Sequence, residues 1–131
     1  MTTTFVLITG AWHGGWAWRP AAEELRAAGS RVLTPTLPRA ARRRRPHPAH
    51  LADVTGYVAD LIEAEDLHDV TLVGHNWGGY VITGAAPRIA PRLRKLVYQS
   101  AFVPAAGRSL YDEVLPGYAA PRRPGRLRLR A

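Results

Sequence analysis

Short apolar runs alternate with amphipathic segments along the first hundred residues of the chain. The apolar runs are rich in β-branched and aliphatic residues and predict four strands, at residues 5–8, 31–34, 70–73 and 93–98. The segments between them predict three helices, at residues 20–28, about 53–66 and about 77–86. Pro20 suits the first turn of the first helix, Gly29 marks its end, and Asp53 is the expected N-cap of the second.

This alternation predicts an α/β fold with a doubly wound, mostly parallel sheet. Parallel strands are joined by right-handed crossovers, and these place helices on both faces of the sheet. Ligands in such sheets bind beyond the carboxyl ends of the strands. The loops at residues 9–18 and 74–79 follow two of the predicted strands and are therefore the expected site. Ser109 is expected to cap a last short helix.

The composition narrows the class of protein. A length of 131 residues corresponds to one domain, and 47% hydrophobic residues are enough for a packed core. The chain has no cysteine, which excludes disulfides and thiolate metal sites, and neither a metal nor a cofactor is expected. No apolar run is long enough to span a bilayer, and the N-terminus lacks a basic leader region. We therefore expect a cytoplasmic protein that does not bind membranes.

The net charge of +8 is concentrated in two arginine clusters, at residues 39–45 and 122–130. Arginine clusters attract phosphate, so an Arg-rich interaction protein is one alternative. The clusters carry no interleaved aromatic residues, no helical spacing and no recognisable nucleic-acid module. The favoured interpretation is two solvated, proline-interrupted segments that do not bind nucleic acid.

The segment at residues 74–79, Gly-His-Asn-Trp-Gly-Gly, carries the clearest motif. It follows an apolar strand and opens an apolar helix, which is the setting of a nucleophile elbow, G-x-S-x-G. The central residue of such an elbow occupies a strained turn. Glycines two positions before and after it allow the strand and helix backbones to approach each other. Gly74 and Gly78 meet this requirement around Asn76.

These motifs resemble the α/β-hydrolase superfamily, in particular the small esterase branch of plant methylesterases, hydroxynitrile lyases and their bacterial relatives. The resemblance covers most of residues 4–115 and implies a truncated α/β-hydrolase fold. Residues 39–50 match poorly, and the tail after about Tyr118 does not match. The matching segments are FVLITGAWHGGW at residues 5–16, LIEAEDLHDV at 61–70, GHNWGG at 74–79 and LVYQSAFVP at 96–104.

The resemblance also implies a set of site residues. The backbone N–H groups of Ala11, or alternatively Trp12, and of Trp77 would form an oxyanion hole. Gly10, Trp12 and His13 are the expected substrate contacts, and His13 is expected to be structural or to touch the substrate rather than to act as a base. The implied partner is a small-molecule ester or apolar ligand.

Two features depart from the family pattern. Asn76 stands where the family has Ser, or Asp in the epoxide-hydrolase and haloalkane-dehalogenase branches, and an amide is not a competent nucleophile. No histidine follows His75, so the general base that the family places late in the chain is absent from this sequence. By the resemblance, His75 itself points away from the substrate. Asp112 and Glu113 are expected on a surface helix.

Family members are commonly about twice as long as this chain. We therefore expect residues 1–115 to be the N-terminal half of a hydrolase domain and residues 116–131 to be a disordered Arg/Pro-rich tail. Our hypothesis is that the Arg/Pro/Ala-rich end reflects a frame change or truncation in a GC-rich coding sequence. Translation of the neighbouring frames tests this hypothesis, because they should then encode a family-like Asp and His.

The sequence therefore predicts a chain descended from carboxylic-ester hydrolases that is inactive or only weakly active with Asn76 at the nucleophile position. One alternative is a non-catalytic domain that binds small apolar ligands through Trp12, Trp16, Trp18 and Trp77. Another is an epoxide-hydrolase or dehalogenase-like remnant, in which residue 76 deamidates to Asp and forms an alkyl-enzyme ester. The sequence leaves substrate identity and oligomeric state open.

Overall fold

A computed structural model describes residues 2–38 and 51–106. Both arginine clusters, the predicted cap Ser109, the acids Asp112 and Glu113, and the predicted tail at residues 116–131 lie outside these residues.

Four parallel strands form one sheet in the order β2-β1-β3-β4, which confirms the predicted α/β fold class. All four predicted strands are present, but β3 and β4 each continue three residues further than predicted. They pair with each other along this extension, where Gly74 lies opposite Tyr98 and His75 opposite Gln99. Such a partner is distant in sequence, so no local pattern indicates it. The strands span Thr4–Ile8 (β1), Arg31–Leu33 (β2), Val70–Asn76 (β3) and Leu93–Ala101 (β4).

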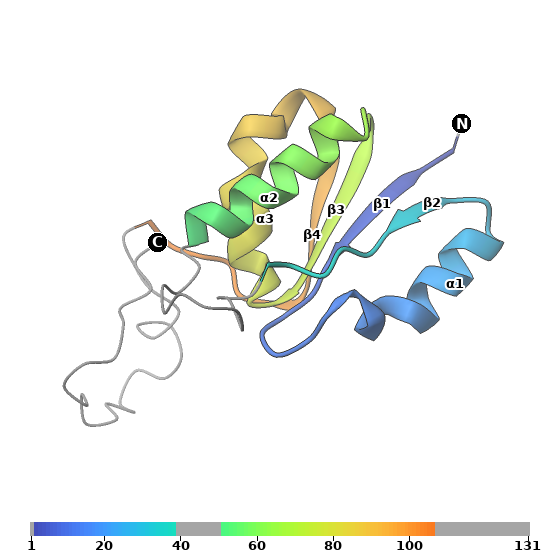
Figure 1. The fold of residues 1–131 in the computed structure, drawn as a ribbon, viewed down its shortest axis with the longest axis horizontal. Helices are drawn as coiled ribbons and strands as arrows, with labels where there is room; N and C mark the ends of the chain where they lie inside the picture. Colours follow the sequence, from blue (N-terminus) through green and yellow to red (C-terminus); the bar gives the residue numbers. More distant parts are fainter. Residues whose placement is uncertain (1, 39–50, 107–131) are drawn as a thin grey trace.

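The helices cover opposite faces of the sheet (Figure 1). Helix α1 packs beside β2 on one face, whereas α2 and α3 pack against each other on the other face. This division follows from the strand order, because a right-handed crossover from β1 to β2 and one from β2 to β3 run in opposite directions across the sheet. The helices span Arg19–Ala27 (α1), Leu51–Ala64 (α2) and Gly78–Ile89 (α3), with short 3₁₀ turns at Gly15–Trp18 (η1) and Ala90–Arg92 (η2).

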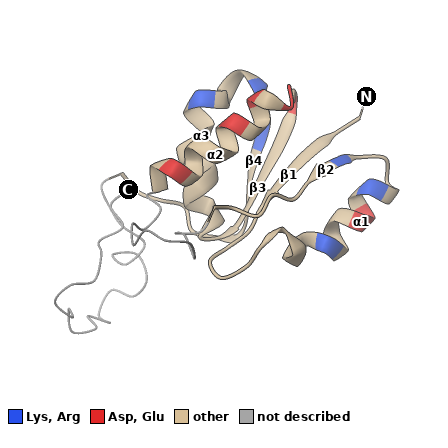
Figure 2. Cartoon of the chain, viewed as in Figure 1, with Lys and Arg blue, Asp and Glu red and all other residues tan. Residues whose placement is uncertain are grey.

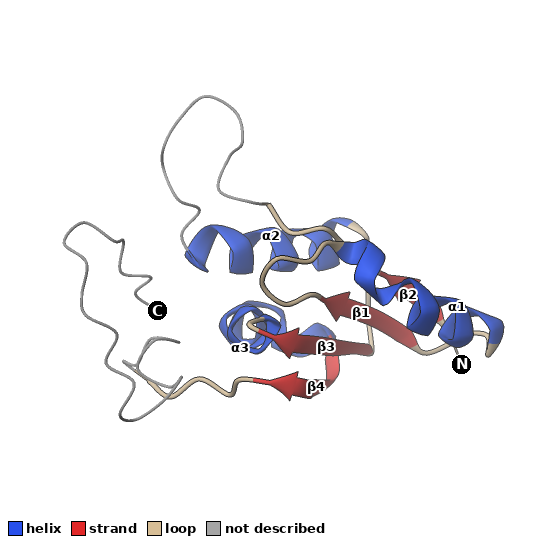
Figure 3. Ribbon diagram, turned by 90° about the horizontal axis from the view of Figure 1, so that it is seen from below, coloured by secondary structure: helices blue, strands red, loops and turns tan. Residues whose placement is uncertain are grey.

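The carboxyl ends of β1 and β3 lie side by side where the strand order reverses. Ile8, the last residue of β1, is opposite Gly74 in β3. The arrows of β1, β3 and β4 point the same way, so the chain leaves all three strands at one edge (Figure 3). In doubly wound sheets this reversal opens the crevice in which ligands bind. The topology therefore brings the two predicted site loops together.

The core forms two layers, as expected for strands that are buried on both faces. Val6 and Ile8 of β1 face α2 and α3, whereas Leu7 between them faces α1. The layer under α2 and α3 is the larger of the two, and its buried members include Val58, Ile62, Leu72, Val81, Ile82 and Ile89.

Two helices end in a left-handed residue that stops the helical hydrogen bonding. Gly29, at φ +92°, follows α1, and the N–H of Ser30 donates back to the carbonyl of Leu25. Asp66, at φ +48°, follows α2, and the N–H of Leu67 donates back to the carbonyl of Ile62. Gly29 is the predicted stop of α1, although the helix ends at Ala27, one residue before its predicted end. Helix α2 ends two residues before its predicted end because Asp66 has left the helical conformation.

The prediction that Asp53 is an N-cap is wrong. Helix α2 begins at Leu51, so Asp53 lies inside its first turn. An acidic side chain is favourable there because it faces the positive end of the helix dipole. An acid in the first turn and an acid at the cap give the same local sequence signal, which explains the misplacement. Helix α3 likewise begins at Gly78 and continues through Pro87 to Ile89, past its predicted end at residue 86.

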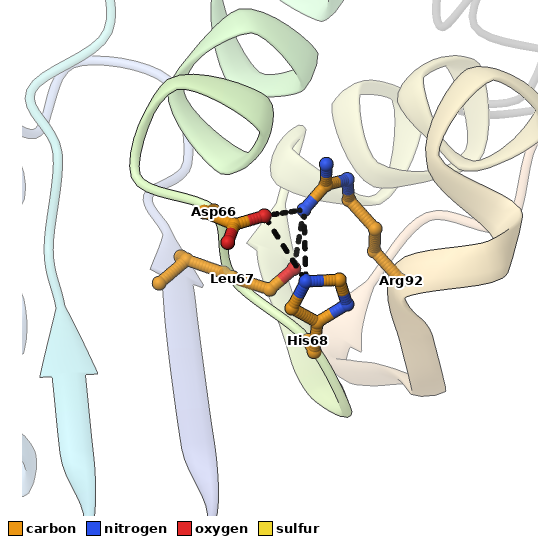
Figure 4. Close-up of polar contacts among 4 residues, drawn as sticks. All are labelled: Asp66, Leu67, His68 and Arg92. Carbon is orange, nitrogen blue, oxygen red and sulfur yellow. Dashed lines mark hydrogen bonds and ion pairs between the residues drawn. The ribbon is translucent and has the colours of Figure 1, made fainter.

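A polar cluster joins the turn before β3 to η2, at the edge of the sheet opposite the site loops (Figure 4). Arg92 Nη1 donates to Asp66 Oδ1 at 2.9 Å and to the carbonyl of Leu67 at 3.1 Å. His68 Nε2 lies 3.0 Å from the same Asp66 oxygen. The hydrogen bond from Arg92, followed by that from His68, lowers the pKa of Asp66. The cluster therefore fastens the amino-terminal ends of β3 and β4 to each other.

Arg88 of α3 links the two neighbouring helices on their exposed side. It donates two hydrogen bonds to Glu63, at 3.0 and 2.7 Å, and one to Asp60. The bond from Arg88 lowers the pKa of Glu63 below its ordinary value of 4.5. Exposed ion pairs individually contribute little to folding stability. Two hydrogen bonds from one guanidinium to the same carboxylate, however, fix the relative orientation of the two groups.

We expect Arg88→Met to lower the melting temperature at neutral pH while leaving the fold intact. Because the pKa of Glu63 is lowered in the folded state, its contribution is fully present above its ordinary pKa and is lost as the pH falls through the lowered value. The melting-temperature difference between wild type and variant should therefore shrink in strongly acidic solution and in high salt. A difference that is independent of both pH and salt would contradict the ion-pair account.

No helix within residues 2–38 and 51–106 is long and apolar enough to cross a membrane.

Candidate active site at the carboxyl edge of the sheet

The centre of the site is a tight turn between β3 and α3. Asn76, the last residue of β3, has φ +54°, and α3 begins two residues later. This conformation is costly for a residue with a side chain and persists only where the surroundings impose it. A Cβ on Gly74 would lie 2.6 Å from the carbonyl oxygen of Gly78, and a Cβ on Gly78 would lie 2.9 Å from that of Ile8. Both glycines are therefore sterically required, as the motif predicts.

The side chain of Asn76 is held on two sides. Its Oδ1 accepts a hydrogen bond from the backbone N–H of Trp77 at 2.7 Å. On the other side, a Cβ on Gly10 would lie only 2.7 Å from the Asn76 Cβ, so the loop after β1 packs directly on this residue. The structure thus brings Gly10, Asn76 and Trp77, all predicted site residues, to one place.

The loop at residues 9–18 is shaped by hydrogen bonds to its own backbone. Thr9 Oγ1 donates to the carbonyl of His13 at 3.2 Å, and His13 Nδ1 lies 3.1 Å from the carbonyl of Ala11. The N–H of Gly15 donates to Thr36 Oγ1 at 2.9 Å. Thr36 is 21 residues away, so the sequence offers no signal that it supports this loop. Trp12, at the tip, adopts φ +71°.

A hollow of about 190 Å³ adjoins the turn on the α1 face of the sheet. Gly10 belongs both to this hollow and to the packing around Asn76. Of its lining residues, Gln99 lies outside the two predicted site loops, and the unforeseen extension of β4 carries it to this edge. His75 lies edge-on to Trp18, with ring centroids 6.2 Å apart. The hollow is lined by Thr9, Gly10, His13, Ala17, Trp18, His75 and Gln99.

The four tryptophans do not all line this hollow. Trp12 and Trp16 are 91% and 69% exposed. Trp77 packs against the core between the sheet and α2 and α3, and of the four only Trp18 lines the hollow. The described residues thus place one of the four rings at this hollow, and a Trp-lined binding pocket stays a prediction. The number of tryptophans in a sequence does not indicate on which face of the fold each one lies.

Both loops are free of formal charge. Residues 9–18, 74–79 and 99–106 contain no Asp, Glu, Lys or Arg, and the charged side chains lie on the helices and at the amino-terminal ends of strands (Figure 2). His13 and His75 are the titratable side chains lining the hollow. Within the part of the chain that the structure describes, no group of three His, Cys, Asp or Glu could hold a metal ion. An uncharged surface of this kind suits a neutral ligand, because a buried charge would find no partner there.

Known proteins match this chain in sequence and in fold. The family model of the α/β hydrolase family matches residues 5–131. The carbendazim-hydrolysing esterase of a Nocardioides species is 54% identical over 112 residues, which are 81% of this chain and 45% of the esterase. The α-hydroxynitrile lyase of Arabidopsis thaliana is 35% identical over 105 residues, which are 76% of this chain and 40% of the lyase.

The fold also matches solved structures. An extracellular α/β-hydrolase of a Paenibacillus species, described as homologous to tobacco salicylic acid-binding protein 2, superposes with a TM-score of 0.80 at 33% identity. The superposition covers 88% of this chain and 47% of that structure. The chain thus spans less than half the length of these relatives. The family model covers nearly the whole chain, and the chain therefore belongs to the α/β hydrolase family.

Proposed function

We propose that the turn at Asn76 and the loop at residues 9–18 form the acyl-group site of a carboxylic-ester hydrolase with low intrinsic turnover. Asn76 occupies the nucleophile position, and the backbone N–H groups of Ala11 and Trp77 are the oxyanion donors. The observation that carries the proposal is the left-handed Asn76 at the end of β3, packed on Gly10. The similarity to an esterase and the uncharged loops support a small neutral ester as substrate.

Asn76 lowers activity in two ways. Its amide nitrogen is not a nucleophile, so no acyl-enzyme can form. Its Oδ1 also occupies the N–H of Trp77, so the side chain fills the place where a developing oxyanion would bind. Removing one oxyanion donor costs about 2.7–4 kcal/mol of transition-state stabilisation in enzymes where it has been tested. An ester bound here therefore reacts slowly.

Asn76→Ser is the direct test. Serine supplies a hydroxyl at the same position, and its short side chain releases the N–H of Trp77 for the substrate. Because the family's late histidine is absent, acylation should be slow, so an ester with a good leaving group is needed. With 4-nitrophenyl acetate we expect a slow burst of about one equivalent of nitrophenol per chain and an acetyl group on residue 76 in the intact mass. Asn76→Ala, which frees the donor without supplying a nucleophile, should give no burst. A folded Asn76→Ser protein without burst or acetylation would refute the proposed site.

A second candidate reaction is nucleophilic displacement at an alkyl carbon, with Asp at residue 76. One observation favours it: the N–H of Trp77 donates to Oδ1 of the Asn76 side chain and not to the second terminal atom, Nδ2. In aspartate both terminal atoms are oxygens, so one would be oriented by this N–H while the other attacks.

A further inference from the structure

His13 has a defined hydrogen position despite its exposure. Its Nδ1 lies 3.1 Å from the carbonyl oxygen of Ala11. A carbonyl oxygen can only accept, so Nδ1 carries the hydrogen and donates it. In the neutral ring Nε2 then has no hydrogen and presents a lone pair. A base whose far nitrogen is oriented by a backbone carbonyl or carboxylate is the arrangement that general-base histidines use.

The fold also connects this imidazole to the proposed acyl site through a shared hollow. His13 and Gly10 line the same hollow, and Gly10 packs on Asn76. The hydrogen bond from Thr9 Oγ1 to the His13 carbonyl and the tilted contact of its ring with Trp16, at 5.6 Å between centroids, hold this part of the loop. The hollow, of about 190 Å³, has room for several water molecules.

We propose that His13 acts as the general base of a slow hydrolysis in which water attacks a bound ester directly, with no covalent intermediate at residue 76. This step rests on the ester site of the proposed function. A water molecule gives a proton to His13 Nε2 as its oxygen bonds to the ester carbonyl carbon. The tetrahedral intermediate then breaks its bond to the alkoxy oxygen, which takes the proton back from the imidazolium and leaves as the alcohol, while the acid remains as the second product.

His75 is the competing imidazole. It lines the same hollow, but its ring is partly buried against Trp18, and no carbonyl fixes its tautomer among the contacts of the described residues. No Asp, Glu, Lys or Arg in the two loops faces either ring. Of the two histidines, His13 is therefore the one that the structure prepares as a base.

His13→Asn tests the proposal sharply, because the amide NH₂ of asparagine can still donate to the Ala11 carbonyl while the Nε2 position is lost. With 4-nitrophenyl acetate and the full 131-residue chain, we expect kcat to fall about tenfold or more with KM changed less than twofold. His68→Asn, at the opposite edge of the sheet, is the matched control and should keep the wild-type rate.

The outcomes separate this inference from the proposed function. Wild-type turnover that survives His13→Asn, or that falls more in His75→Asn, overturns the role of His13. A complete lack of wild-type turnover above the buffer rate overturns it as well. If the Asn76→Ser burst is then still seen, the proposed site stands without His13. If His13→Asn loses activity but Asn76→Ser shows no burst, water attack at His13 is supported and the acyl-transfer role of residue 76 fails.

Discussion

Gly79→Ala is expected to prevent the chain from folding stably. A Cβ on residue 79 would overlap the backbone carbonyl oxygen of Phe102, in the segment that follows β4. A backbone carbonyl cannot move to relieve this overlap as the end of a flexible side chain can. Helix α3 and the end of β4 would therefore have to separate. Overpacking of ordinary core positions already costs about 1–3 kcal/mol, and a clash with backbone lies at or above the upper end of that range. Urea unfolding monitored by circular dichroism measures the loss.

Two other glycines provide graded controls. A Cβ on Gly84 would meet the side chain of Thr55 at 2.6 Å, which a rotamer change can relieve, so Gly84→Ala should be clearly milder. A Cβ on Gly56, inside α2, would meet nothing within 4 Å. Gly56→Ala should therefore stabilise the chain by about 0.5–1 kcal/mol through helix propensity. If Gly79→Ala proves as harmless as Gly56→Ala, the packing of α3 against the end of β4 is not as described.

Asn76→Asp is expected to let a haloalkane alkylate the chain once, at residue 76. One carboxylate oxygen would accept the N–H of Trp77, as Oδ1 does at 2.7 Å in the amide. The other would attack the halogen-bearing carbon, forming a C–O ester bond as the C–Br bond breaks and bromide leaves. The absence of charged side chains from both site loops leaves this carboxylate without a competing cation. Brief incubation with 1-bromobutane, acid quenching and intact-mass measurement should show one butyl group per chain.

The adduct must map to residue 76 to support this reaction. Wild type and Asn76→Ala have no carboxylate there and should remain unmodified under the same conditions, which also controls for alkylation of histidines. A folded Asn76→Asp chain with no adduct after prolonged incubation would exclude the displacement reaction. The acyl-transfer proposal would be unaffected, because its test uses a serine hydroxyl, whose side chain is shorter than that of aspartate and whose basicity differs from that of a carboxylate.

Local pattern was sufficient for most of the fold. The apolar runs that became β1 and β3 are short, continuous and bounded by glycine or polar residues, so periodicity identified them as buried strands. The predictions failed mainly at the ends of helices and strands. The extension of β4 to Ala101 depends on pairing with β3, and the end of α2 depends on the left-handed Asp66, a residue type that gives a weaker signal than glycine.

The residues of the candidate site also fall into those that the sequence could predict and those that it could not. Gly74, Asn76 and Gly78 could be assigned from spacing alone, because a strained turn between a strand and a helix demands small residues at fixed positions. The proximity of Gly10 could be expected only from the family resemblance and the rule for parallel sheets. Gln99, Thr36 and the bond between His13 and Ala11 could not be foreseen, since each depends on side-chain placement or on residues distant in the chain.

The sequence by itself thus determined the class of fold, the position of the turn and the identity of the residue at its tip, because strand periodicity and glycine spacing are local properties. Only the tertiary structure decided what surrounds that tip. It turned the Asn76 oxygen onto the N–H of Trp77, placed Trp77 on the core side and Trp18 on the hollow side, and set His13 with its Nδ1 against a carbonyl. Those outcomes depend on how distant segments pack against one another, and no short stretch of sequence contains that information.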